Sequence, residues 1–343
     1  MHFKNEKAAL VAPKTIELIT EDIVDLPSDS VLLKVAYCGI CGSDIPRFFQ
    51  GKVHNFPLVL GHEFSGEVIS KGDRVTKFAI GDRVAGIPLV PCMQCPECKN
   101  GHYQLCSNYS FIGSRQAGAF QKYLILKEEN IFKLLPGTDL MSAALIEPLT
   151  VAIHAVKLVK SLKDESQVAI FGFGVIGACL AAYLKDKGFH NITIITNSNK
   201  RKGIAEKLNI DEFYRASDKS VLLKKFDVVF DCTSISSALE FLLPLINPRG
   251  AISIIGSKNS QCEISATAFN LIQRHEIQVI GSWMSYSALW PGEEWLEARE
   301  VLLKYPDCFK DLIQNVFPLK KVPEAFEDVI NNSPKVLIAP NEE

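Results

Sequence analysis

The chain has 343 residues, which is long enough for two domains of about 150 residues each. Its 47% hydrophobic and 22% charged residues are typical of a globular protein, and its formal net charge of −2 offers no basic surface for nucleic acid or an anionic membrane. The segment MHFKNEKAAL lacks the features of a signal peptide, and no run approaches the roughly 18 apolar residues that span a bilayer. We therefore expect a cytoplasmic protein without nucleic-acid or membrane partners.

Short runs rich in Val and Ile, separated by turns, predict a compact β-domain over the first part of the chain. Residues 31–37 follow a Pro-Ser-Asp turn and are typical of a strand, and glycines recur at short intervals through residues 56–90. Residues 123–126 predict a further strand.

The segment 41–63 begins with Cys-Gly-Ser-Asp and ends with Gly-His-Glu. The thiolate of Cys41 and the imidazole of His62 are donors that zinc prefers in a site with one position open for substrate. Such a pair, far apart in sequence, is also compatible with an ordinary buried cysteine and a hydrogen-bonded histidine. The residues around the pair must decide between the two interpretations.

A cluster of cysteines with the spacing C-x2-C-x2-C-x7-C follows at Cys92, Cys95, Cys98 and Cys106. In a long chain without a secretion signal, such a cluster favours a metal over disulfides. Four thiolates complete a tetrahedral zinc shell and leave no position for substrate, so the site would be structural. An iron–sulfur cluster and chance clustering are the alternatives. His102 lies within this lobe and is expected at the surface.

Residues 140–160 have the apolar spacing of a helix, which we expect to be interrupted at Pro148. Glu147 lies within this apolar run. A buried carboxylate there requires a partner or a metal, whereas a carboxylate at a helix end would face solvent. Both interpretations stay open on these residues alone.

An α/β pattern begins near residue 161. The apolar run 168–171 predicts a buried parallel strand, the helical run 175–187 ends at a glycine, and residues 192–195 predict a second strand. Later strands are expected at 227–232 and at 251–255, the last entered through a turn at 248–250.

The first strand, 168–171, runs directly into a G-x-G-x-x-G motif, in the context that marks a dinucleotide-binding turn. Its candidate cofactor-binding residues are Gly172, Gly174, Val175, Ile176 and Gly177. Helix–strand packing alone is the alternative role of these glycines.

The acid that usually holds the ribose hydroxyls of NAD is missing. Thr196 and Asn197 occupy its place, with Lys200 and Arg201 close behind. Loss of the carboxylate removes repulsion of a 2′-phosphate, yet Thr196 and Asn197 could equally hydrogen-bond the ribose. The choice between NAD and NADP therefore stays open, with Arg201 a further candidate contact.

All three tryptophans fall within residues 281–295, which could line a pocket, form an interface or belong to the core. From residue 316 the chain returns to short strand-like runs, such as 336–338, which we expect to rejoin the β-domain.

Taken together, these motifs resemble the zinc-containing medium-chain alcohol dehydrogenase family. The stretch from Gly61 matches the family pattern G-H-E-x2-G-x5-G-x2-V, and the cysteine lobe and glycine motif follow in the family's order. The resemblance implies an α/β protein with a GroES-like, β-rich catalytic domain at residues 1–155 and 287–343. It implies a Rossmann doubly wound dinucleotide-binding domain at residues 156–286.

The resemblance also implies roles for residues near the first motif. Cys41 and His62 would hold a catalytic zinc, and Glu147 would be its third ligand or hold the zinc-bound water. Glu63 takes the place of Glu147 as a ligand in some relatives. Ser43 would relay the substrate proton, and Asp44 would orient the imidazole of His62. With the cysteine lobe, the chain would bind two Zn²⁺ and NAD or NADP.

Within the family, stretches such as CGSDIPRFF and IGSWMSYSALWPGEEW are similar to enzymes of polyol phosphates. The implied reaction is hydride transfer between galactitol 1-phosphate and a nicotinamide, giving tagatose 6-phosphate, by a homodimer or homotetramer. The rivals are a sorbitol, other polyol or threonine dehydrogenase, a zinc-free reductase of the superfamily, and a non-catalytic zinc-binding module. Candidate cations for the phosphate are Arg47, Lys52, His54 and Arg115.

Overall fold

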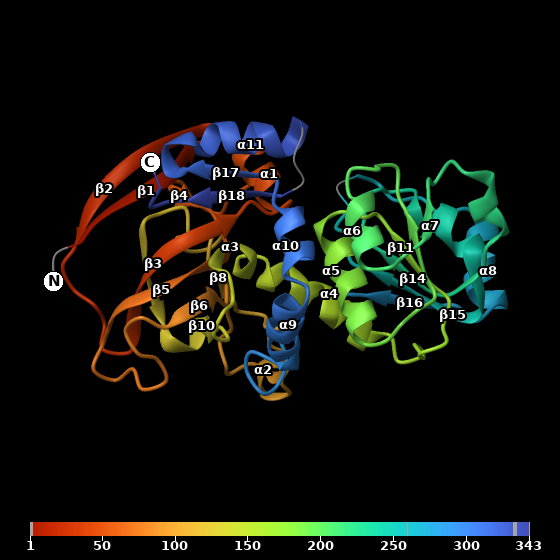
Figure 1. Ribbon diagram of the computed structural model, residues 1–343, viewed down its shortest axis with the longest axis horizontal. Coiled ribbons are helices and arrows are strands. Elements are labelled where there is room, and N and C mark those ends of the chain that lie inside the picture. The colour runs from red at the N-terminus through yellow and green to blue at the C-terminus, as the bar shows by residue number, and fades with distance from the viewer. Residues whose placement is uncertain (1–2, 259, 332–334, 343) are drawn as a thin grey trace. The chain divides into compact units, whose positions relative to one another are not determined.

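The computed structural model describes residues 3–258, 260–331 and 335–342 and divides into two compact units (Figure 1). The first unit comprises Met1–Glu147 and Tyr286–Glu343, and the second comprises Pro148–Ser285. The first division falls inside helix α4 (Ile146–Leu158), so residues 148–155 group with the second unit rather than with the first, where we expected them. Within the described ranges, no helix is both long and apolar enough to cross a bilayer.

The first unit is built from β-sheets. The strand order is β2-β1-β4 in one sheet and β10-β6-β5-β3-β18-β17 in a larger sheet, with β9 also paired to β3 and β7 paired to β8. The strands are β1 (Phe3–Ala12), β2 (Thr15–Ile23), β3 (Ser30–Gly39), β4 (Leu58–Val59), β5 (Glu63–Lys71), β6 (Arg83–Gly86), β7 (Leu89–Val90), β8 (Ser110–Phe111), β9 (Tyr123–Lys127), β10 (Ile131–Lys133), β17 (Asn315–Pro318) and β18 (Val336–Ala339).

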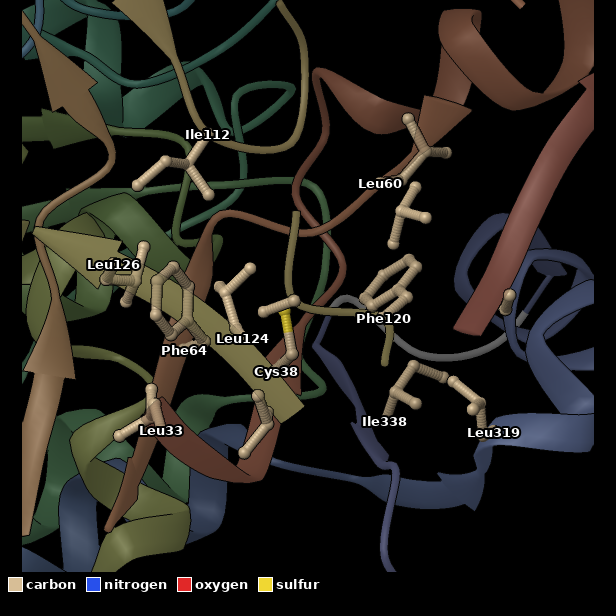
Figure 2. Close-up of a cluster of buried hydrophobic side chains, with 14 of the residues drawn as sticks. Leu33, Cys38, Leu60, Phe64, Ile112, Phe120, Leu124, Leu126, Leu319 and Ile338 are labelled. Atoms are coloured by element: carbon tan, nitrogen blue, oxygen red, sulfur yellow. The ribbon is translucent and has the colours of Figure 1, made fainter. Parts of the chain in front are cut away.

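Buried side chains from these sheets form one apolar core. Leu33 of β3, Phe64 of β5 and Ile338 of β18 point into it together with Phe120 (Figure 2). Lys34 on β3 is exposed between the buried Leu33 and Val35. The helices of this unit are α1 (Asp44–Gln50), α2 (Pro96–Lys99), α3 (Leu140–Ala143), α9 (Glu293–Lys304), α10 (Pro306–Leu312) and α11 (Val322–Asn331).

Strand β18 pairs with β3 in the middle of the larger sheet, which confirms that the last strand rejoins the β-domain. The expected interruption at Pro148 is wrong. The helical stretch breaks between α3 and α4, and Pro148 lies in the first turn of α4, where a missing N–H costs no hydrogen bond. Trp295 is fully buried core, whereas Trp283 is half exposed.

The second unit contains a parallel sheet of order β13-β12-β11-β14-β15-β16, the order of a Rossmann fold. The strands are β11 (Val168–Phe171), β12 (Ile192–Ile195), β13 (Glu212–Tyr214), β14 (Phe226–Asp231), β15 (Ile246–Ile254) and β16 (Gln278–Gly281). The helices are α5 (Val175–Asp186), α6 (Lys202–Lys207), α7 (Ala238–Leu242) and α8 (Ala266–Arg274).

Alternate residues of β11 face the two sides of this sheet. Ala169 and Phe171 join a core with residues of α7 and α8, whereas Ile170 faces Gly177 of α5. Helices therefore cover both faces, as in a doubly wound fold. The strand expected at 251–255 begins earlier, because β15 starts at Ile246 and passes through residues 248–250 with a register shift against β14.

Candidate active site

The ladder between β3 and β5 brings Cys41 and His62 together. Gly39 at the end of β3 pairs with Glu63 at the start of β5, so the residues just beyond one strand lie beside those just before the other. Gly61 has φ +97°, and a Cβ there would collide with Sγ of Cys38, so the turn into His62 requires glycine. One ligand atom from each of Cys41, His62 and Glu63 lies within 4.8 Å of the others.

Asp44 links the cysteine turn to the histidine. Its side chain is fully buried, and its Oδ2 accepts a hydrogen bond from the backbone N–H of Cys41 at 3.1 Å. Its Oδ1 lies 3.6 Å from Nδ1 of His62. Arg47 donates to the same Oδ1 at 2.8 Å and to the Ser43 hydroxyl at 3.1 Å. The guanidinium therefore bridges Asp44 and Ser43.

Glu63 forms a buried ion pair with Lys335, from the segment just before β18. The ammonium of Lys335 also donates to the Ile40 carbonyl at 3.2 Å, and both side chains are almost completely buried. Burial alone would lower the pKa of Lys335, but the carboxylate of Glu63 and the neighbouring Cys41 raise it overall. The lysine is therefore a cation beside the cysteine–histidine pair.

Glu147 lies in the first turn of α4 and is also buried. The preceding helix α3 is fixed to β5 by the Ser65 hydroxyl, which donates to the Leu140 carbonyl at 2.5 Å. Burial raises the pKa of Glu147 to about 7. The nearby His62 acts to lower this pKa, and the negative charge of Glu63 acts to raise it. The sequence left two interpretations of this acid open, and the structure places it inside the protein with these titratable groups.

These donors fit a divalent metal. A thiol, an imidazole and carboxylates are the donor types of a catalytic zinc site. Burial raises the pKa of the Cys41 thiol, so its thiolate requires a nearby cation, as does the buried carboxylate of Glu147. Nδ1 of His62 is buried without a hydrogen-bond partner among the described residues, close enough to Asp44 to be oriented by it.

The Lys335–Glu63 pair gives a first prediction. Lys335→Met should lower the free energy of unfolding by about 3–5 kcal/mol, because it leaves a buried carboxylate uncompensated. We expect a fall in Tm of roughly 10 °C in a thermal melt. The control is Lys122→Met, which removes a partly exposed pair with Glu6 at 3.7 Å and should cost less than about 1 kcal/mol.

The double variant Lys335→Met with Glu63→Gln should recover much of the lost stability, since it removes the buried charge. Equal melting temperatures for the single and double variants would contradict an uncompensated Glu63 as the cause.

The four lobe cysteines converge as their spacing predicted. Their sulfur atoms lie within 4.8 Å of one another. The backbone N–H of Cys92 points at Sγ of Cys106 at 3.3 Å, and that of Cys95 points at Sγ of Cys92 at 3.4 Å. Backbone N–H groups of Cys98 and Ser107 lower the pKa of Cys95 to about 6, which favours the thiolate that binds metal. His102 is exposed, as expected.

The glycine motif forms the turn between β11 and α5. Gly172 has φ +90° and donates to the Ile195 carbonyl at 2.9 Å, and a Cβ on Gly177 would collide with the Gly172 carbonyl. Thr196 and Asn197 follow β12 at the same edge and line a cavity of about 260 Å³ with Gly172. Val175 and Ile176 open α5. The motif therefore lies where a dinucleotide fold binds its pyrophosphate.

The candidate phosphate contacts differ in their surroundings. Lys52 and His54 are exposed, and Arg47 is engaged with Ser43 and Asp44. Arg115 is exposed and held in place: it donates to the Tyr109 carbonyl at 2.7 Å, and its guanidinium lies 3.9 Å from the Tyr109 ring centroid. Phe111, at the end of β8 just before this loop, has its ring centroid 5.5 Å from that of His62.

Two cations near the site were not predicted from the sequence. Lys335 directly precedes an apolar strand, and its position there is the sequence feature that could have indicated burial. Arg215 follows β13 and donates to the Asn197 carbonyl at 3.2 Å. Neither contact follows from local spacing, because each depends on strand pairing in the folded sheet.

Family models match both units. The alcohol dehydrogenase GroES-like domain matches residues 27–136, and the zinc-binding dehydrogenase domain matches residues 175–301. The chain belongs to the family of zinc-dependent medium-chain alcohol and polyol dehydrogenases, and its two units are the GroES-like and Rossmann folds of that family.

The chain is 33% identical to galactitol 1-phosphate 5-dehydrogenase of Escherichia coli K12, with 91% of this chain and 93% of that protein covered. It is 34% identical to D-arabitol-phosphate dehydrogenase of Enterococcus avium, with 94% and 93% covered. The crystal structure of galactitol-1-phosphate dehydrogenase from Escherichia coli superposes with a TM-score of 0.90 at 31% identity, with 98% of this chain and all of that chain (100%) covered.

Proposed function

We propose that this chain oxidises a polyol phosphate, galactitol 1-phosphate to tagatose 6-phosphate, and reduces a nicotinamide dinucleotide. The cluster of half-buried Cys41 with buried His62 and Glu63, with Glu147 in the same group of charges, is the observation that supports the chemistry most directly. Two relatives named for polyol phosphates support the substrate class. We place the reaction in the cytoplasm of the cell, in a homodimer or homotetramer.

In this proposal Cys41, His62 and Glu147 would hold a catalytic zinc, and Glu63 would be the alternative to Glu147 as a ligand. Glu63 is the alternate because Lys335 already pairs with it. When bound, the zinc supplies Lewis-acid polarisation of the substrate hydroxyl, and the nicotinamide accepts the hydride. A second zinc in the cysteine lobe is structural, because four thiolates close its shell.

The chain's own residues move the proton and fix the geometry. The Ser43 hydroxyl accepts the proton of the substrate hydroxyl and passes it towards solvent. The hydrogen on the carbinol carbon leaves as hydride with the C–H bonding pair, and that carbon becomes a carbonyl. Asp44 orients the imidazole of His62, and we propose that Arg47 orients both Ser43 and Asp44. Arg47 was a candidate phosphate contact, but its two partners favour this positioning role.

Arg115 is then the best-supported cation for the substrate phosphate. Arg115→Ala should raise KM for galactitol 1-phosphate by on the order of ten- to a hundredfold, the value of one charge-assisted hydrogen bond, and leave KM for free galactitol nearly unchanged. Steady-state kinetics on both substrates measure the difference. The control is Arg74→Ala, which removes an exposed guanidinium bonded to Ser28. Equal increases on both substrates would remove Arg115 from the phosphate site.

The proposal as a whole is tested by following reduced nicotinamide with galactitol 1-phosphate, galactitol, sorbitol and threonine, each with NAD⁺ and NADP⁺. The phosphate ester should have the highest kcat/KM. A higher value for sorbitol or threonine would assign the chain to the alternative polyol or threonine dehydrogenases. Light scattering during gel filtration measures the oligomeric state, and a monomer would contradict that part.

A further inference from the structure

The edge of the Rossmann sheet where β12 ends carries an unusual set of side chains. The cavity there is lined by Gly172, Thr196, Asn197, Ser198 and Thr233 among others, and no carboxylate belongs to its described lining. Thr196 stands where a ribose-binding acid is usual, and its Oγ1 accepts a hydrogen bond from the Ser198 backbone at 3.3 Å. The position is therefore polar but uncharged.

A guanidinium borders the same segment. Ile195 of β12 pairs with Tyr214 of β13, and the Thr196 N–H donates to the Tyr214 carbonyl at 2.9 Å, so the next residue, Arg215, is fixed beside the end of β12. Nη2 of Arg215 donates to the Asn197 carbonyl at 3.2 Å. The side chain is exposed, and this partner is a carbonyl rather than a carboxylate.

A second cation, Arg201, contacts the glycine turn. Arg201 is buried, and its Nη1 donates to the Phe173 carbonyl at 3.0 Å. Its Nε and Nη2 are buried without partners among the described residues. Burial lowers the pKa of Arg201 to about 10, so the group stays charged at neutral pH.

Two acids lie near these cations: Asp218, whose Oδ2 accepts a hydrogen bond from the Arg215 backbone N–H at 2.8 Å, and Asp231. Asp231 ends β14, and Lys258 pairs with it at 2.6 Å and also donates to the Thr233 carbonyl. Thr233 lines the cavity. The three cations Arg215, Arg201 and Lys258 therefore outnumber the two acids, and the edge carries net positive charge.

We propose that this chain prefers NADP(H) to NAD(H), with the adenosine 2′-phosphate bound by the Arg215 guanidinium and the Thr196 hydroxyl. The inference rests on the proposed function, because it assigns the cofactor of that dehydrogenase. A planar guanidinium binds phosphate oxygens through two parallel hydrogen bonds. The absent carboxylate would otherwise repel the phosphate, and Arg201 adds favourable charge from below the turn.

The test measures dinucleotide binding without substrate, by nucleotide fluorescence on the zinc-loaded protein. The unmodified protein should bind NADPH at least tenfold more tightly than NADH. Arg215→Ala should weaken NADPH binding by on the order of ten- to a hundredfold and change NADH binding by less than about twofold. Thr196→Asp should reverse the preference by placing a carboxylate against the phosphate. Arg249→Ala is the matched control. Arg249 is also an exposed arginine, but it lines a different cavity, together with Asp227 and Gln278.

Equal or tighter binding of NADH by the unmodified protein would overturn the inference, as would equal losses for both nucleotides in Arg215→Ala. The outcome is separable from that of the proposed function. Tight NADPH binding without turnover of any polyol phosphate would remove the proposed substrate and leave the cofactor assignment in place.

Discussion

Replacing Cys41 with alanine should remove one of two zinc ions and lower kcat/KM by at least about a thousandfold. The thiol lies within 4.8 Å of the His62 and Glu63 donors, and no other described cysteine joins that group. Loss of a Lewis acid withdraws several kcal/mol of transition-state stabilisation, and each 1.36 kcal/mol corresponds to about tenfold in rate. Metal analysis of the purified protein and steady-state kinetics measure the two effects.

Cys38→Ala is the matched control. Cys38 lies three positions earlier, and its thiol is fully buried in the apolar core (Figure 2). This variant should lose some stability by leaving a small void, yet keep both zinc ions. If Cys41→Ala retained two zinc ions and normal turnover, the proposed metal centre would be wrong. Loss of zinc in the Cys38 variant alone would point to the same conclusion.

Replacing Cys98 with serine should remove the other zinc and destabilise the protein more than any single core truncation. The free energy of zinc binding to a closed thiolate shell adds to the free energy of folding, and it is about 10–16 kcal/mol in small zinc peptides. Cys98 is buried on α2, a helix of only four residues that cannot persist without support. We expect Tm to fall by roughly 10 °C or more, with new protease cleavage within residues 92–106.

The control for this prediction is Cys262→Ser, at an exposed thiol in the second unit. It changes the thiol count equally and should leave zinc content and Tm unchanged. Two zinc ions and an unaltered melting temperature in Cys98→Ser would exclude a structural metal in the lobe.

The features that could be predicted from the sequence share one physical property: their chemistry is encoded locally. The cysteine lobe completes its ligand set within one short loop. The glycine turn likewise depends on a strand, a turn and a helix that are contiguous, and β11 and β12 have the predicted bounds. The pairing of Cys41 with His62 needed the family resemblance, because only the β3–β5 register brings them together.

The features that were missed depend on tertiary structure. Pro148 was expected to break a helix, but a proline in the first turn of α4 leaves the helix intact. The bond from Arg201 to the Phe173 carbonyl links a helix start to a turn that is distant in sequence. Lys335 reaches Glu63 across 272 residues, and no periodicity or spacing rule covers such a distance.

Because Lys335 follows Glu63 by 272 residues, the ribosome synthesises the two partners at very different times. The second unit is one contiguous segment, Pro148–Ser285, and can fold as soon as it emerges, because domains generally fold as units during translation. The first unit cannot, because Lys335 and β18 complete the surroundings of Glu63 and the middle of the sheet beside β3. The glycine turn and the end of β12 can therefore form before Lys335 joins the surroundings of Glu63. A nascent chain stalled before residue 335 would carry the complete second unit and a first unit that still lacks Lys335 and β18.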